Sequence, residues 1–117
     1  MLTLNEILTD FAAFLGSAPG SVATRGPNGE SPLHWMATLG DAEAICLLVA
    51  GGAELSAIDH NGDTPLHEAV ANRQVAAAKA LIDLGANIHL CNAAGQTPQD
   101  IAMRDGYNPT VALFAGH

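Results

Sequence analysis

Three short stretches decide the fold: SPLH at 31–34, TPLH at 64–67 and TPQD at 97–100. Each begins 33 positions after the one before it, and a glycine stands two positions ahead of each. A Gly-Ala pair recurs at the same interval, at 52–53 and 85–86. An interval that repeats in several places along a chain of this length predicts stacked structural repeats.

Each stretch also carries the signals of a helix start. A Ser or Thr in the first place can accept a hydrogen bond from an orphan amide, and the proline after it suits the first helical position because its missing N–H is harmless there. The pattern predicts first helices over 32–39, 65–72 and 98–104. Gly40 and Gly106 are placed to end two of them in a left-handed conformation.

A second helix is expected in each repeat, at 42–50, 74–84 and 109–115. Apolar residues of these helices recur at the repeat interval, as Leu48 and Leu81 do. Stacked helices that share one continuous core require this register. We therefore expect these residues to stabilise the fold rather than to bind a ligand.

The period and the SPLH and TPLH stretches resemble the ankyrin-repeat family, whose repeat carries a T-P-L-H-x-A signature. The resemblance implies an all-α solenoid of stacked helix-turn-helix units with projecting hairpin-like loops, here called fingers. Fingers and first helices would form a concave face. We expect a single domain over 1–117, with an N-terminal cap at 1–25, repeat 1 at 26–58, repeat 2 at 59–91, and repeat 3 with the C-terminal cap at 92–117.

The histidines of the motif have a structural role in this family. The resemblance implies that His34 and His67 each tie the Ser or Thr cap to the neighbouring finger through both ring nitrogens. Asp100 takes the same place in the third repeat. These side chains are therefore not candidates for acid–base chemistry.

A transition-metal site is the alternative use of histidine here. His60 and His89 belong to fingers, and with His67, Asp59 and Asp63 nearby they offer ligands of the right chemistry. No HxxxH, HExxH or Cys/His pair at ligand spacing fixes them, and no nucleophile elbow or phosphate-binding loop occurs. We expect no enzyme activity, no metal and no cofactor.

Charge and composition narrow the class of partner. The 117 residues include 4 basic and 12 acidic side chains, which gives a formal net charge of -8. Such a chain repels nucleic acid and favours a basic protein partner. The N-terminus has neither the basic region of a signal peptide nor a membrane span, and Cys46 and Cys91 form no CxxC pair, so we expect a cytoplasmic protein that is monomeric when free.

The resemblance also implies where the partner binds, namely on finger tips and the exposed side of the first helices. Trp35 either contacts the partner or lies under the N-terminal cap, and both alternatives stay open. The positions that match the family's recognition sites are Arg25, Pro27, Asn28, Glu30, Thr38 and Leu39 in the first repeat, Ile58, His60, Asn61, Asp63, Ala71 and Asn72 in the middle repeat, and Cys91, Ala93, Ala94, Gln96, Arg104 and Asp105 in the third. Glu68, which stands at the position of Trp35 on the next first helix, is also expected to face the partner.

The function that these observations favour is binding, and through it regulation or inhibition, of one protein partner. The chain resembles the small, acidic, free-standing ankyrin proteins found in bacteria, some of which are immunity proteins that occlude a toxin. An immunity function is thus the sharper hypothesis. An adaptor or regulatory subunit of an enzyme complex is the alternative, followed by a metal-dependent activity at the finger histidines.

Overall fold

The computed structural model describes residues 29–115. These residues form helices and connecting loops, with no strand among them. The all-α prediction is confirmed, while the N-terminal cap expected over 1–25 lies outside the described residues. The helices are α2 (Pro32–Leu39), α3 (Ala42–Ala50), α4 (Pro65–Ala71), α5 (Val75–Asp83), α6 (Pro98–Asp105) and α7 (Asn108–Ala112).

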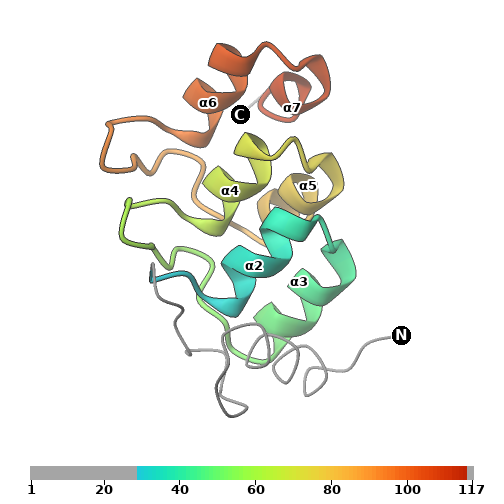
Figure 1. Cartoon of the computed structure of the whole chain (residues 1–117). Coiled ribbons are helices and arrows are strands. Elements are labelled where there is room, and N and C mark those ends of the chain that lie inside the picture. Colours follow the sequence, from blue (N-terminus) through green and yellow to red (C-terminus); the bar gives the residue numbers. More distant parts are fainter. Residues whose placement is uncertain (1–28, 116–117) are drawn as a thin grey trace.

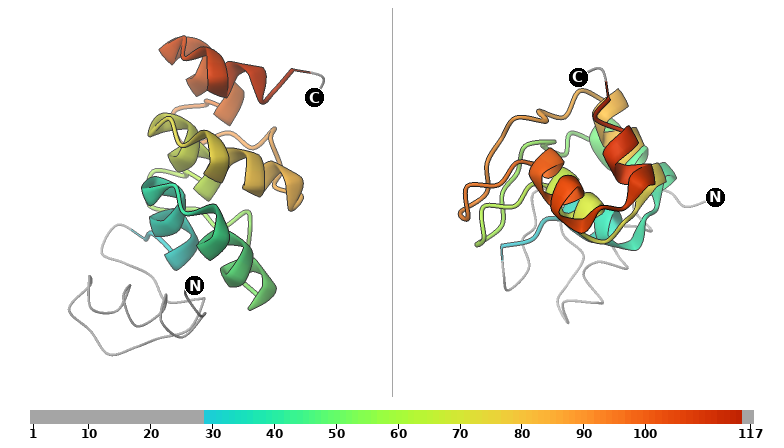
Figure 2. Two further views of the ribbon diagram at one scale, coloured as in Figure 1. Left: turned by 90° about the vertical axis from the view of Figure 1, so that its right-hand side faces the viewer. Right: turned by 90° about the horizontal axis from the view of Figure 1, so that it is seen from above.

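The helices stack in two columns. α2, α4 and α6 pack on one another in the first column, and α3, α5 and α7 follow one another in the second (Figure 1). The view from above in Figure 2 shows the long loops projecting from the side of the first column. The arrangement is a solenoid in which each helix pair covers the next.

The predicted caps form at each first helix. The side chains of Ser31, Thr64 and Thr97 accept hydrogen bonds from the backbone N–H three residues on, at 3.2 to 3.3 Å. A proline stands at the first turn of all three helices. These contacts satisfy amides that a helix start leaves without a partner.

The ends of the first helices share one register as well. Gly40 and Gly106 have φ angles of 81° and 66°, in the left-handed region. Arg73 occupies the same register in the middle repeat and is left-handed too, with φ of 57°. Its guanidinium carbon lies 5.1 Å from the centre of the Tyr107 ring, within the range of a cation–π contact.

The last helix differs from the expectation. α7 ends at Ala112 rather than at 115, because the amides of Phe114 and Ala115 bond to carbonyls three residues back. Such bonds tighten the chain into a turn. The other boundaries agree with the prediction to within a residue or two.

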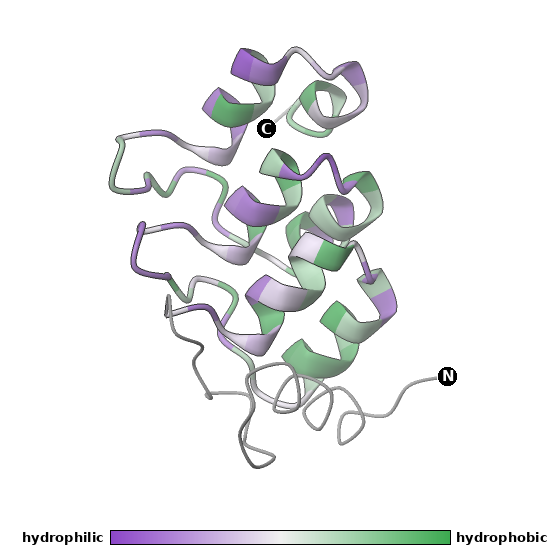
Figure 3. Cartoon of the chain, in the orientation of Figure 1, coloured by the Kyte–Doolittle hydropathy of each residue, from purple (hydrophilic) through white to green (hydrophobic). Residues whose placement is uncertain are grey.

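The core runs between the two columns. Leu33 and Leu66 enter it from the first column and Leu48 and Leu81 from the second, and none of the four is more than 1% exposed. Burial of each is worth roughly 1.5–3 kcal/mol. Figure 3 shows the hydrophobic residues gathered on the helices, while the finger at 59–63 is hydrophilic. None of the described helices has the length and apolar character needed to cross a membrane.

Candidate functional site

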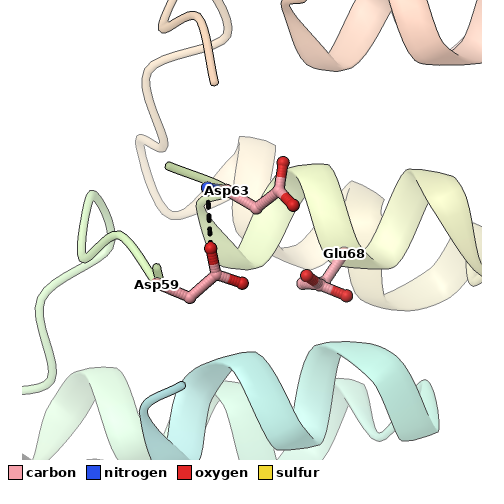
Figure 4. A group of neighbouring side chains, drawn as sticks. All are labelled: Asp59, Asp63 and Glu68. Carbon is pink, nitrogen blue, oxygen red and sulfur yellow. Dashed lines mark hydrogen bonds between the residues drawn. The ribbon is translucent and has the colours of Figure 1, made fainter. Parts of the chain in front are cut away.

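The finger of the second repeat is held by one aspartate. Asp59 and Asp63 are joined through their backbones at 3.1 Å, and the N–H of Gly62 donates to the carbonyl of Asp59 at 3.0 Å. The carboxylate oxygen Oδ1 of Asp59 also accepts from the N–H groups of Asn61 and Asp63, at 2.9 and 3.0 Å (Figure 4). The loop tip therefore has a defined shape.

Successive fingers are bonded to each other. Asn92 closes the finger of the third repeat in the same way, through its Oδ1. Its Nδ2 donates to the Asp63 carboxylate at 2.9 Å, and the N–H of Ala93 donates to the Asn61 carbonyl at 2.9 Å. The fingers of repeats 2 and 3 thus form one ladder.

The motif histidines connect helices to fingers. The Nδ1 atom of His34 accepts from the backbone N–H of Ser31 at 3.1 Å, so the proton of the neutral ring sits on Nε2, which donates to the Asp63 carbonyl at 2.7 Å. His67 repeats this arrangement with Thr64 and the carbonyl of Gln96. The implied structural role of both histidines is confirmed.

A pocket of about 290 Å³ lies where repeats 1 and 2 meet on the finger side. One wall belongs to α2, another to the finger before α4, and the third to α4 itself. The pocket is lined by Glu30, His34, Trp35, Thr38, Asp59, Asn61 and Glu68.

Carboxylates gather at this pocket. Asp59, Asp63 and Glu68 each bring a carboxylate oxygen to within 4.8 Å of the other two (Figure 4). Burial raises the pKa of Glu68 to about 7, with further increases from the charges of Asp63 and Asp59, from its hydrogen bond with Asp59, and from the charge of Glu30. At neutral pH, Glu68 is therefore close to half-protonated.

Two stacked helix columns, capped TPLH-type helix starts and projecting fingers point to one family. The family model described as "Ankyrin repeats (3 copies)" matches residues 4–92 and 33–117 of the chain. The chain belongs to the ankyrin-repeat family. Ankyrin repeats are generally protein–protein interaction modules and are typically not enzymes. A search of curated proteins found no match to the chain.

Several of the positions expected to bind a partner meet at the pocket between repeats 1 and 2. Trp35, Thr38, Asn61 and Glu68 line it together. Asp63 belongs to the group of three carboxylates formed with Asp59 and Glu68. Trp35 is half-buried, packs against the core and also lines the pocket, and both alternatives drawn from the sequence stay open. Its relation to the N-terminal cap lies outside the described residues.

Other expected positions lie away from the pocket. Leu39 and Ile58 are 57% and 58% exposed, so each offers apolar surface that a partner could cover. Arg104 and Asp105 pair with each other at 3.6 Å near the end of α6. His60, Ala71, Asn72, Cys91, Ala93 and Ala94 are exposed, Gln96 is half-buried, and Arg25, Pro27 and Asn28 lie outside the described residues.

The histidine metal site considered from the sequence does not form. His67 is buried with both ring nitrogens bonded, and no set of three or more possible ligands within residues 29–115 includes a histidine. The one set that does form there is Asp59, Asp63 and Glu68, whose oxygen ligands suit a hard divalent cation.

Sequence reasoning gave Asp59 and Asn92 too little weight as positioning residues. Asp59 shapes its finger and lines the pocket, and Asn92 fixes the Asp63 carboxylate. The signal was present, because the two stand 33 residues apart at a position where only Asp and Asn can make this turn well.

Proposed function

We propose that this ankyrin-repeat chain is a non-enzymatic module that binds a basic protein partner and inhibits it by covering its functional surface, as an immunity protein covers a toxin. The binding surface, called here the finger-side surface, consists of the fingers at 58–63 and 91–96 and the exposed side chains of α2 and α4. The protein acts in the cytoplasm and is monomeric before it binds.

The rigid ladder of fingers carries the proposal. Hydrogen bonds between Asn92 and Asp63 and between Ala93 and Asn61 hold two fingers in one geometry before any partner arrives. Binding then orders little additional backbone, and so less of the interaction energy is spent on conformational entropy. Exposed Leu39 and Ile58 lie on this surface and gain most from being covered.

Charge supports a basic partner. The chain has a formal charge of -8, and several of its carboxylates meet at the pocket on the finger side. Opposite fields steer two proteins together and disfavour partners of the wrong sign. Cys46 and Cys91 are both exposed and free, which suits a reducing compartment.

Affinity capture from a lysate of the source organism tests the proposal. The finger-side variant carries Leu39→Lys with Ile58→Lys, and the control carries Ala50→Lys with Ala76→Lys, which adds the same charge at exposed positions of α3 and α5. A partner retained by the wild type and the control and lost by the finger-side variant is expected. Equal retention by all three proteins would contradict the proposed surface.

The captured partner then separates inhibition from other outputs. Its own activity is assayed with increasing amounts of the wild-type protein. Inhibition that saturates at one equivalent is expected. An unchanged activity, with a third protein joining the complex, would instead establish an adaptor.

A further inference from the structure

The pocket between repeats 1 and 2 has the size of a single side chain. Its volume of about 290 Å³ is at the lower limit of small-molecule sites, which span about 300–1,000 Å³. It opens among residues of α2, the finger and α4, on the finger-side surface. A side chain that projects from a bound partner fits this space and position.

Carboxylates and other acceptors are prominent among the polar groups of the pocket. Asp59 and Glu68 contribute carboxylates. The hydroxyl of Thr38 donates its proton to the His34 carbonyl at 3.0 Å, so its oxygen faces any ligand as an acceptor. Asn61 adds an amide with both an acceptor and donors. A cationic ligand with several donors complements the carboxylates of this lining.

The carboxylates are held in place before binding. Two backbone N–H groups fix Oδ1 of Asp59, and the Asn92 amide fixes Oδ1 of Asp63. Neither aspartate has to give up its fold contacts to receive a ligand, because each carboxylate has a second oxygen. Preorganised acceptors of this kind lower the entropic cost of binding.

The cations of the described residues are engaged elsewhere. Lys79 pairs with Asp83 at 3.4 Å, Arg104 pairs with Asp105, and Arg73 stacks on Tyr107. The charges of Asp63 and Asp59 raise the pKa of the half-buried Glu68 beyond the effect of its burial, which shows that these three carboxylates repel one another. A cation supplied by a partner relieves this repulsion.

We propose that the pocket receives the guanidinium of an arginine side chain from the protein partner, between the carboxylates of Asp59 and Glu68 and the indole of Trp35. This inference rests on the proposed function and names the chemistry that the finger-side surface recognises. Arginine suits the site better than lysine, because its planar fork has five donors and it stacks on aromatic rings. The carboxylates of Asp59 and Glu68 repel the negative charge of a phosphate or carboxylate ligand.

Binding is coupled to the proton of Glu68. A guanidinium favours the ionised carboxylate, and Glu68, whose pKa is about 7, must lose its proton to pair with it. The other titratable groups around Glu68 are Asp59, Asp63 and Glu30, all acidic, and His34 across the pocket on α2, whose two ring nitrogens are bonded. Affinity for a guanidinium should therefore rise by up to about tenfold from pH 6 to pH 8.

Titration of the full chain with L-argininamide tests the pocket directly. Trp35 is the sole tryptophan of the protein, so its fluorescence reports on the site, and backbone NMR shifts locate it. We expect saturable binding in the millimolar range, as befits one isolated side chain, with shifts at Trp35, Asn61 and Glu68. L-citrullinamide, which has the same shape without the charge, should produce no such shifts.

Two variants sharpen the titration. Glu68→Gln keeps the side-chain shape and should weaken argininamide binding at pH 8 by at least about fivefold and abolish its pH dependence. Glu54→Gln removes one exposed acid outside the pocket and should leave binding unchanged. Thermal unfolding confirms that both variants are folded.

Four results would overturn the inference. They are a response to citrullinamide equal to that of argininamide, no response to either, equal weakening by both variants, or saturable Ca²⁺ or Mg²⁺ binding at the carboxylates with no binding of argininamide. If argininamide fails while the captured partner is still lost by the Leu39 and Ile58 variant, the pocket assignment fails and the proposed function stands. If argininamide binds but no partner passes the capture test, the proposed function fails and the pocket serves another guanidinium compound.

Discussion

Some side chains of this protein stabilise the finger-side surface, and others are placed to bind a ligand there. The two roles differ in their effect on stability. His34 and His67 are buried and bonded through both ring nitrogens, so they fix the fingers. Glu68 is held among other acids in an arrangement that disfavours its own charge. Substitution of either histidine should therefore lower the free energy of unfolding, whereas substitution of Glu68 by a neutral residue should raise it at neutral pH.

Replacement of His67 by alanine should destabilise the protein by about 2–4 kcal/mol. The substitution leaves the buried amide of Thr64 and the half-buried carbonyl of Gln96 without their partners. Urea unfolding measures the change. His89→Ala, at an exposed loop position, is the control and should stay within about 0.5 kcal/mol of the wild type. Equal costs for the two histidines would contradict the structural role.

Glu68→Gln should remove a pH dependence of stability. The folded-state pKa of Glu68 is raised from 4.5 to about 7, so its contribution to stability is complete below about pH 4.5 and is lost as the pH rises through 7. The variant should match the wild type near pH 4.5 and exceed its unfolding free energy at pH 8 by about 1 kcal/mol, since water screens a half-buried carboxyl. Parallel pH profiles of unfolding for the two proteins would refute this origin.

At the scale of elements, the first helices end at the same position of each repeat, and a different residue stands there in the middle repeat. Gly40, Arg73 and Gly106 are all left-handed, but their surroundings differ. A Cβ atom on Gly40 would lie 2.3 Å from Oε1 of Gln74, whose amide donates to the Thr38 carbonyl. A Cβ atom on Gly106 would meet nothing within 4 Å.

Alanine at these two glycines should therefore have unequal effects. Gly106→Ala pays only the left-handed backbone penalty, about 1–2 kcal/mol. Gly40→Ala should cost roughly 1 kcal/mol more, because Gln74 must move and lose its hydrogen bond. Chemical denaturation of both variants measures the difference, and Gln74→Ala in both backgrounds should abolish it. Equal costs would mean that the contact between repeats contributes nothing.

The sequence predicted the helices well because their signals are local. Ser or Thr caps, prolines at the first turn and glycines at the end each act within a few residues, so a single repeat shows them. The helix over 109–115 was placed too long, because the turn after Ala112 depends on bonds that leave no distinct residue signature. The pocket could not be derived, since it arises only when α2 and the next repeat's finger are brought together.

The same limit explains which site residues were found. Trp35 and Glu68 were selected for their place on the first helices, and both line the pocket. Asp59 was considered only as a metal ligand, although it shapes the finger and the pocket. The raised pKa of Glu68 depends first on its burial and then on the nearby charges of Asp63 and Asp59, which spacing alone does not show.

At the scale of the whole molecule, the surface of α6 differs from the equivalent surfaces of α2 and α4. Met103 is 61% exposed, while Ala37 and Val70 at the equivalent positions are buried by the following repeat. Gln99 and Asp100 stand where the earlier repeats have leucine and histidine. Polar substitutions suit a face of α6 on which no described helix packs.

Met103→Gln should then leave stability within about 0.5 kcal/mol of the wild type, since little apolar surface is lost. Val70→Gln, at the equivalent position inside the stack, should destabilise by more than about 3 kcal/mol because it buries an unpaired amide. Thermal unfolding of the two variants gives the comparison. Similar losses would indicate that Met103 is covered in solution.

Charge acts over the molecule as a whole. With a formal net charge of -8, association with a basic partner should be steered by long-range attraction. The association rate measured by stopped flow should fall several-fold between low salt and about 0.5 M salt, while the dissociation rate changes less. An association rate independent of salt would exclude a basic partner surface.

Hydrogen exchange of the chain with and without its captured partner tests whether that partner binds the finger-side surface. We expect slowed exchange at the amides of 58–63 and 91–96 and of α2 and α4, with no change in α3 and α5. Protection confined to α3 and α5, with the fingers exchanging as in the free protein, would contradict it.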